Sequence, residues 1–113
     1  MNLTPIVLFV YDRPDHVRQT VEALKKNVLA LDSELFIYSD AAKNKNGEDK
    51  VNKVRQYIKN IDGFKKVTIF ERKKNLGLAG SIIDGVTKIV NDYGKVIVLE
   101  DDLVTSPFFL NEI

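Results

Sequence analysis

The sequence predicts an α/β fold, with a mainly parallel sheet that carries helices on both of its faces. Four short apolar runs are continuous rather than alternating, which is typical of strands that are covered on both sides. The segments between these runs space their apolar residues as amphipathic helices do. Successive runs end about 30 residues apart, the length of one strand–helix–strand step. Strand and helix therefore alternate along the chain, which favours parallel strands joined by crossover helices.

Each of the four predicted strands is followed by a polar side chain. The strands cover residues 6–10, 35–38, 67–70 and 96–99, and the polar residues after them are Asp12, Asp40, Arg72 and Asp101. In a parallel sheet such residues gather at one edge, and α/β proteins bind ligands there, near the point where the strand order reverses. The position favours a nucleotide-sized ligand.

Three helices are predicted between the strands. The first begins near Pro14, because proline is tolerated in a first turn. The second begins at the acidic pair Glu48-Asp49, which suits a helix N-terminus. The third ends before Gly94. The apolar stripes are Val17, Val21, Leu24 and Val28 in the first helix, Val51, Val54, Ile58 and Ile61 in the second, and Leu78, Ile82, Val86, Ile89 and Val90 in the third.

We expect residues 1–113 to form one domain, because no segment has the composition of an interdomain linker. A further helix is predicted to start at Thr105-Ser106-Pro107, with little chain after it to pack against. We therefore expect the chain to be the front part of a larger domain.

Composition narrows the classes of function. Of the 113 residues, 44% are apolar and 29% are charged, as in ordinary soluble domains. The net charge of +1 gives no overall attraction for nucleic acid, so we expect no nucleic-acid partner. No apolar stretch is long enough to span a bilayer and the chain does not begin like a secretion signal, so we expect a cytoplasmic location. Because the chain has no cysteine, disulfides and thiolate metal sites are excluded.

Charge is distributed unevenly along the chain. Residues 43–74 hold eleven basic and four acidic side chains, a net charge of +7, whereas residues 75–113 carry a net charge of −4. We interpret the lysines of the basic segment as a solvated helix face rather than as a phosphate site. The single histidine, His16, is expected at the surface.

Three carboxylates in a row, Glu100, Asp101 and Asp102, follow the fourth predicted strand. Adjacent negative charges repel one another, so such a cluster is favourable where a cation compensates it. Hard oxygen ligands without a neighbouring histidine or cysteine indicate Mg²⁺ or Mn²⁺. The alternative is that the acids only end the strand and that one of them caps the next helix.

The first predicted strand is followed by Tyr11-Asp12-Arg13-Pro14. The planar guanidinium of Arg13 is suited to a phosphate, and the carboxylate of Asp12 is suited to capping the first helix. A surface arginine beside a structural cap is the alternative interpretation.

Two more polar segments follow the second and third strands. Asp40 is placed to accept a hydrogen bond from a uracil N–H or a ribose hydroxyl, or else to cap a turn. Arg72 precedes Asn75-Leu76-Gly77, where the glycine would let the backbone approach a ligand.

Together these motifs resemble the nucleotide-binding half of GT-A glycosyltransferases, namely the Golgi N-acetylglucosaminyltransferase I family and family-2-like bacterial sugar transferases. Residues 96–103, continuing to Pro107-Phe108-Phe109, resemble the metal-binding strand and next helix of the first family, in which an acidic triplet replaces the general Asp-x-Asp motif. Asp12-Arg13 and Ser39-Asp40 lie where that family has its nucleotide contacts. Residues 72–81 resemble the family-2 pattern instead.

The resemblance implies a Rossmann-like nucleotide-binding fold and a metal-dependent glycosyltransferase whose donor is a UDP-sugar. It implies that Asp102 coordinates Mn²⁺ or Mg²⁺ on the donor diphosphate. Arg13 would contact the phosphates, Asp40 the uracil, and Glu100 and Asp101 the ribose or metal-bound water. The full set of implied nucleotide-binding residues is Tyr11, Arg13, Asp40, Arg72, Glu100 and Asp101.

The resemblance also implies a second, acceptor-binding half that follows this one and supplies the carboxylate base of inverting enzymes. We therefore assign no catalytic base. The acceptor would be a glycan or a lipid-linked group, while membrane-surface association and a homo-oligomer stay open. The alternatives are a noncatalytic nucleotide-sugar-binding module, a sugar nucleotidyltransferase, which would need a glycine-rich loop after the first strand, and a phosphoacceptor signalling domain, whose acid pair follows the first strand.

Overall fold

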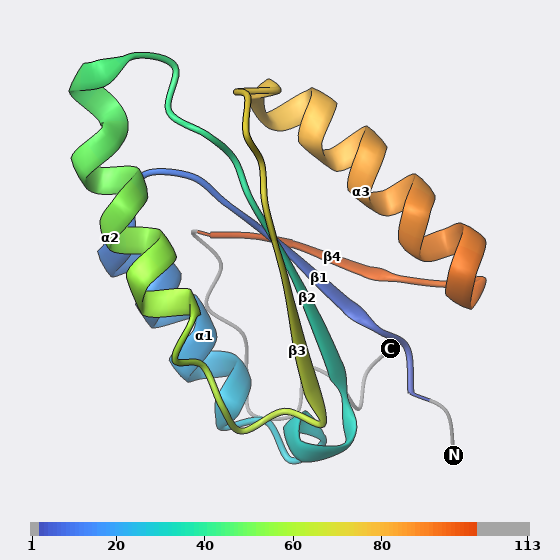
Figure 1. Ribbon diagram of the computed structural model, residues 1–113. Coiled ribbons are helices and arrows are strands. Elements are labelled where there is room, and N and C mark those ends of the chain that lie inside the picture. Colours follow the sequence, from blue (N-terminus) through green and yellow to red (C-terminus); the bar gives the residue numbers. More distant parts are fainter. Residues whose placement is uncertain (1–2, 102–113) are drawn as a thin grey trace.

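The computed structural model describes residues 3–101, and Figure 1 shows their arrangement. Four strands form a single parallel sheet in the order β3-β2-β1-β4, and a helix follows each of the first three. The strands are β1 (Ile6–Val10), β2 (Glu34–Ser39), β3 (Lys66–Glu71) and β4 (Ile97–Glu100), and the helices are α1 (Pro14–Lys25), α2 (Glu48–Ile58) and α3 (Gly77–Tyr93). The predicted α/β class is confirmed, and each predicted strand lies within one residue of its observed bounds.

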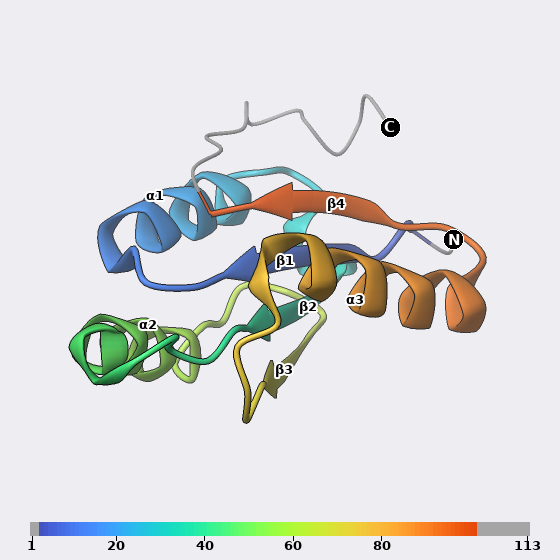
Figure 2. The ribbon, with the colours of Figure 1, turned by 90° about the horizontal axis from the view of Figure 1, so that it is seen from above.

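The helices form a layer on each side of the sheet, as predicted (Figures 1 and 2). α1 and α2 pack on the face that carries Ile6, Leu8 and Val10 of β1. α3 packs on the opposite face, against Val7 and Phe9. All five residues of β1 are buried, which explains why this strand is a continuous apolar run rather than an alternating one.

The strand order determines where a ligand can bind. The chain builds outward from β1 through β2 to β3, and α3 then carries it back across the sheet to form β4 on the other side of β1. The order therefore reverses between β1 and β4. In open α/β sheets, the carboxyl ends of the two strands at this reversal form a crevice that the connecting helices leave open.

α3 approaches the sheet closely through small residues. Its buried positions are Ser81, Gly85 and Ile89. The predicted stripe is thus partly wrong, because Leu78 is 55% exposed and Val90 is 38% exposed. Small side chains one turn apart let the helix backbone approach the aromatic rings of β1 and β2, and a hydrophobic pattern does not reveal this arrangement.

The start of α1 was predicted correctly, but its end was not. Pro14 lies in the first turn of α1 as predicted, but α1 ends at Lys25. Val28 is therefore outside the helix and 58% exposed, so its assignment to the apolar stripe is wrong. The chain turns at buried Asn27, whose side-chain oxygen accepts a hydrogen bond from the Leu29 N–H.

Gly94 ends α3 with φ of +79°, a conformation in which glycine is favoured. Its N–H donates to the Val90 carbonyl at 2.7 Å. Within residues 3–101, no helix is both long and apolar enough to cross a membrane. The helix predicted from Thr105 and the apolar pair Phe108-Phe109 lie outside the described residues.

Candidate nucleotide-binding site

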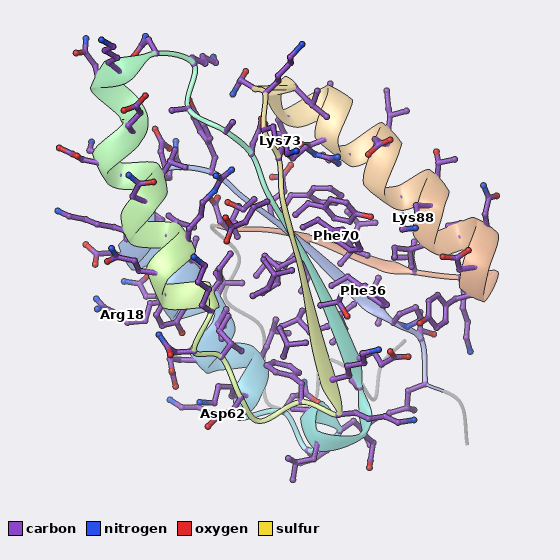
Figure 3. The ribbon with its side chains drawn as sticks, in the orientation of Figure 1. Arg18, Phe36, Asp62, Phe70, Lys73 and Lys88 are labelled. Carbon is purple, nitrogen blue, oxygen red and sulfur yellow. The ribbon has the colours of Figure 1, made fainter. Side chains whose placement is uncertain are left out.

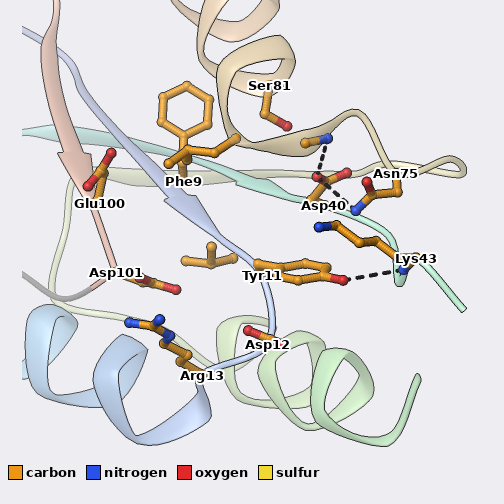
Figure 4. A pocket seen from close by; sticks show the side chains of 13 residues that line it. Phe9, Tyr11, Asp12, Arg13, Asp40, Lys43, Asn75, Ser81, Glu100 and Asp101 are labelled. Carbon is orange, nitrogen blue, oxygen red and sulfur yellow. Dashed lines mark hydrogen bonds between the residues drawn. The ribbon is translucent and has the colours of Figure 1, made fainter. Parts of the chain in front are cut away.

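A pocket of about 340 Å³ opens at the carboxyl ends of β1 and β4, where the strand order reverses (Figure 4). The polar clusters predicted after the first, second and fourth strands all line it. The lining residues are Phe9 and Val10 of β1, Tyr11, Asp12 and Arg13 after it, Asp40 and Lys43 after β2, Asn75 before α3, Gly77, Leu78 and Ser81 in the first turns of α3, Glu100 of β4 and Asp101 after it.

Asp40 is the most buried charged residue of the pocket, with 5% of its surface exposed. Its Oδ1 accepts hydrogen bonds from the backbone N–H groups of Ala41 and Leu76, both at 2.9 Å. Its Oδ2 accepts from the Gly77 N–H at 3.0 Å and from Asn75 Nδ2 at 3.3 Å. A carboxylate offers about four acceptor sites, so the chain itself provides a donor for each.

The β3–α3 loop is thus attached to the end of β2. No side chain of the loop itself caps α3, and the Asp40 carboxylate accepts from the first N–H groups of that helix. Asn75 Nδ2 also donates to the Ala41 carbonyl at 2.7 Å, and Gly77 adopts φ of +75°. The sequence offered two interpretations of Asp40, a contact with the nucleotide or a capping interaction. The capping interaction is present, but its main partner Leu76 is 36 residues away in the sequence rather than in a local turn.

Arg72 does not line the pocket. It forms an ion pair with Asp84 of α3 at 2.7 Å, and its Nε donates to the buried Ser81 hydroxyl at 3.3 Å. The guanidinium lies 4.7 Å from the centre of the Tyr38 ring. Burial raises the pKa of the Tyr38 phenol, and the positive charge of Arg72 opposes this shift. Arg72 therefore joins β3 to α3, and its contact with a nucleotide stays a prediction.

The rings beneath Arg72 form a row across the sheet. Tyr38 stacks between Phe9 of β1 and Phe70 of β3, with centroid distances of 5.5 and 4.6 Å. Lys88 of α3 lies above Phe70 (Figure 3), with Nζ 6.0 Å from the ring centre. This row is the surface on which α3, and with it one wall of the pocket, rests.

Arg55 is a residue that the sequence interpretation missed. It lies on α2 with its side chain 19% exposed, and its Nε donates to the Ser39 hydroxyl at 3.0 Å. Its Nη2 donates to the carbonyls of Ser39 and Arg72, at 3.2 and 2.8 Å. The sequence carried a signal, because Arg55 is one of only two arginines among the nine lysines of residues 43–74 and the only one in the predicted helix. A guanidinium is suited to a buried set of several hydrogen bonds.

The segment after β1 brings a cation to the pocket. Arg13 is exposed at the N-terminus of α1 and lines the pocket beside Tyr11. The prediction that Asp12 caps α1 is wrong, because Arg13 occupies the capping position and no side chain caps this end. Pro14 has no N–H, so this terminus has one donor fewer to satisfy.

Lys43, a lysine of the basic segment, is exposed and is the second cation at the pocket. Its side chain lines the pocket, and its N–H donates to the Tyr11 hydroxyl at 3.3 Å. The other single-residue expectation, that His16 is exposed, is confirmed.

Two members of the acidic triplet, Glu100 and Asp101, line the pocket opposite Asp40 (Figure 4). Arg13 points toward Asp101 in the same view, and the Asp101 carbonyl accepts from the Thr20 hydroxyl of α1 at 2.9 Å. Within residues 3–101, no three acidic or histidine side chains are grouped so as to hold a metal ion. Asp102, the predicted metal ligand, lies outside the described residues.

The comparisons with known proteins agree with this fold. Residues 6–113 match glycosyl transferase family 2, the second of the two resemblances seen in the sequence. No curated protein is significantly similar to the chain. A crystal structure of S. aureus TarS superposes with a TM-score of 0.63 at 12% identity, covering 96% of this chain and 18% of the other. A structure of S. aureus TarS residues 1–349 in complex with UDP superposes with a TM-score of 0.69 at 11% identity, covering 98% of this chain and 30% of the other.

This chain therefore spans less than a third of the length of either structure. The superpositions identify the parallel sheet and its helices as a Rossmann-like GT-A fold. Because the family match extends over nearly the whole chain, the protein belongs to glycosyl transferase family 2.

Proposed function

We propose that the pocket binds the nucleotide of a UDP-sugar and that the chain is the donor-binding part of a metal-dependent glycosyltransferase. The observation that supports this most is the meeting of Arg13, Lys43, Glu100 and Asp101 in one pocket at the reversal of the strand order. Cations attract the diphosphate, and carboxylates accept from ribose hydroxyls or hold a cation. The UDP complex of the structural neighbour supports the choice of nucleotide.

The two sides of the pocket differ in chemistry, and we assign the parts of the ligand accordingly. Asp40, Asn75 and Gly77 form a side rich in fixed hydrogen-bonding groups, which suits a base. Arg13 and Asp101 line the opposite side, which suits the diphosphate and its counterion. A direct contact between Asp40 and uracil would displace a present donor, and the 3.3 Å bond from Asn75 is the longest of the four.

The residues present fit a Mg²⁺ or Mn²⁺ ion in chemical type, because Glu100 and Asp101 offer hard carboxylate oxygens at the pocket. We propose that Asp102 completes this set. When bound, such an ion neutralises charge on the departing nucleoside diphosphate. The chain's own residues would hold the nucleotide and keep the diphosphate beside Arg13.

The experiment is a calorimetric titration of the 113-residue chain with UDP, in Mn²⁺ and again in excess EDTA. We expect binding in Mn²⁺, a large loss of affinity in EDTA, and weaker binding of ADP because the base side of the pocket selects uracil. Absence of UDP binding in Mn²⁺ overturns the proposal. Equal affinity in EDTA overturns the metal dependence alone.

A second measurement separates an enzyme from a noncatalytic binding module. Incubation of the chain with UDP-sugars and Mn²⁺, followed by assay of released UDP, tests slow donor hydrolysis. Release above that of an Asp102→Ala variant supports a transferase. UDP binding without release from any donor favours the module.

A further inference from the structure

We infer that Arg55 is a positioning residue for the nucleotide pocket, although it does not line it. Its guanidinium joins the carboxyl ends of β2 and β3. Asp40, the residue after β2, in turn fixes the conformation of the β3–α3 loop, which forms one wall of the nucleotide pocket. The effect on nucleotide binding rests on the proposed function, whereas the effect on the loop does not.

The first step of the inference is where the donors of Arg55 point. Its three hydrogen bonds all go to Ser39, the last residue of β2, or to Arg72, the first residue after β3. The Ser39 carbonyl also accepts from the Arg72 N–H at 2.9 Å. The two chain segments are therefore joined both directly and through the guanidinium at the point where they leave the sheet.

The second step is what lies beyond that point. Ser39 is fully buried and is followed by Asp40, whose N–H donates to the Val10 carbonyl of β1 at 3.1 Å. The Asp40 carboxylate then accepts from Asn75, Leu76 and Gly77 of the loop that Arg72 begins. Both ends of this loop are therefore anchored at the point where the Arg55 guanidinium joins β2 to β3.

The third step is that neighbouring charge alone does not explain these contacts. Arg55 Nη1 lies 3.9 Å from Glu71 Oε1, and Lys59 Nζ, on the residue that follows α2, lies 3.6 Å from the other Glu71 oxygen. The Lys59 side chain is 60% exposed, against 19% for Arg55. Lys59 shares the charge and the acidic neighbour of Arg55, so Lys59→Gln is a matched control for Arg55→Gln.

The test measures amide hydrogen exchange and binding in the 113-residue chain and both variants. In Arg55→Gln we expect the Leu76 and Gly77 amides to exchange about tenfold faster or more, since hydrogen bonds from a charged group are lost. Amides of β1 should keep their protection, which shows that the variant is folded. Arg55→Lys retains the charge without the fork and should also lose loop protection.

We expect UDP affinity in Mn²⁺ to fall about tenfold in Arg55→Gln and affinity for inorganic pyrophosphate to change little. Lys59→Gln should leave both affinities and the loop amides unchanged. Unchanged exchange at Leu76 and Gly77 in both Arg55 variants overturns the inference, as does an equal change in Lys59→Gln. If the wild-type chain fails to bind UDP while Arg55→Gln still loosens the loop, the proposed function fails and the positioning role of Arg55 in the loop stands.

Discussion

Gly85 of α3 lies directly against Tyr38 of β2: a Cβ atom at Gly85 would be 2.9 Å from Cε2 of that ring. Cε1 of Phe9 would be equally close. Both rings are nearly fully buried and Tyr38 is stacked on each side, so neither can move without disturbing the row of rings. The absence of a side chain at Gly85 therefore sets how closely α3 approaches the sheet.

The first prediction concerns this contact. Gly85→Ala should lower the free energy of unfolding by about 1–3 kcal/mol, because overpacking in a filled core costs more than the helix gains from alanine. Urea unfolding measures the change. Gly80→Ala, in the same helix with a nearest contact of 3.4 Å to Leu76, is the control and should stabilise the fold by up to about 1 kcal/mol. Equal effects of the two variants would contradict the packing argument.

The second prediction concerns the Tyr38 hydroxyl, which is buried with no hydrogen-bond partner among the described residues. A buried polar group without a partner destabilises the folded state. Tyr38→Phe should therefore leave the free energy of unfolding unchanged or raise it by about 1 kcal/mol, as measured by urea unfolding at neutral pH. A loss above that size would show that the hydroxyl has a partner.

Tyr38→Phe should also change how the free energy of unfolding depends on pH. Burial raises the pKa of Tyr38 above its ordinary value of 10.0 in the folded state. The corresponding stability is fully present below pH 10 and is lost as the pH rises through the folded-state pKa. The free energy of unfolding of Tyr38→Phe lacks this loss, so it should exceed that of the wild type by a growing margin above pH 10. Parallel curves for the two proteins would contradict the shift.

The third prediction concerns Asp40. Asp40→Asn replaces one acceptor oxygen by an NH₂ group that faces the backbone donors of Leu76 or Gly77. We expect a loss of about 1.5–3 kcal/mol in the free energy of unfolding, the range for hydrogen bonds to a charged group. Asp92→Asn, exposed near the end of α3, controls for the loss of one carboxylate and should change stability little.

Binding by the Asp40 variant tests its place in the pocket. We expect Asp40→Asn to weaken uridine binding more than pyrophosphate binding, because Asp40 lies on the side of the pocket that we assign to the base. Calorimetry with each ligand alone measures the two affinities. Equal losses would place Asp40 away from the base.

Much of the fold could be predicted because it depends on local patterns. A continuous apolar run such as Ile6–Val10 indicates a strand covered on both faces, and Gly94 marks the end of α3. The spacing of apolar residues could not predict how closely α3 packs against the sheet. Gly85 and Ser81 are small residues that a search for apolar spacing passes over, yet together with Ile89 they form the buried face of α3.

The site was predictable in place but only partly in detail. Strand ends in a parallel sheet meet at one edge, which is why Tyr11, Arg13, Asp40 and Asp101 do lie around one pocket. The partners of each side chain depend on loop conformation, which sequence spacing does not determine. Arg72 therefore binds α3 rather than lining the pocket.

The last prediction concerns Asp102, the metal ligand that the resemblance to metal-binding glycosyltransferases implies. Asp102→Ala should abolish the Mn²⁺-dependent part of UDP binding, because Asp102 is the residue that we propose to coordinate the ion. The free energy of unfolding should change by no more than about 0.5 kcal/mol, since a single carboxylate contributes little to an apolar core. Calorimetry in Mn²⁺ and urea unfolding measure the two effects, with Asp92→Ala as the control because Asp92 does not line the pocket. Unchanged UDP affinity in Asp102→Ala would show that Asp102 does not hold the ion and would leave Arg13, Lys43, Glu100 and Asp101 as the charged groups of the donor site.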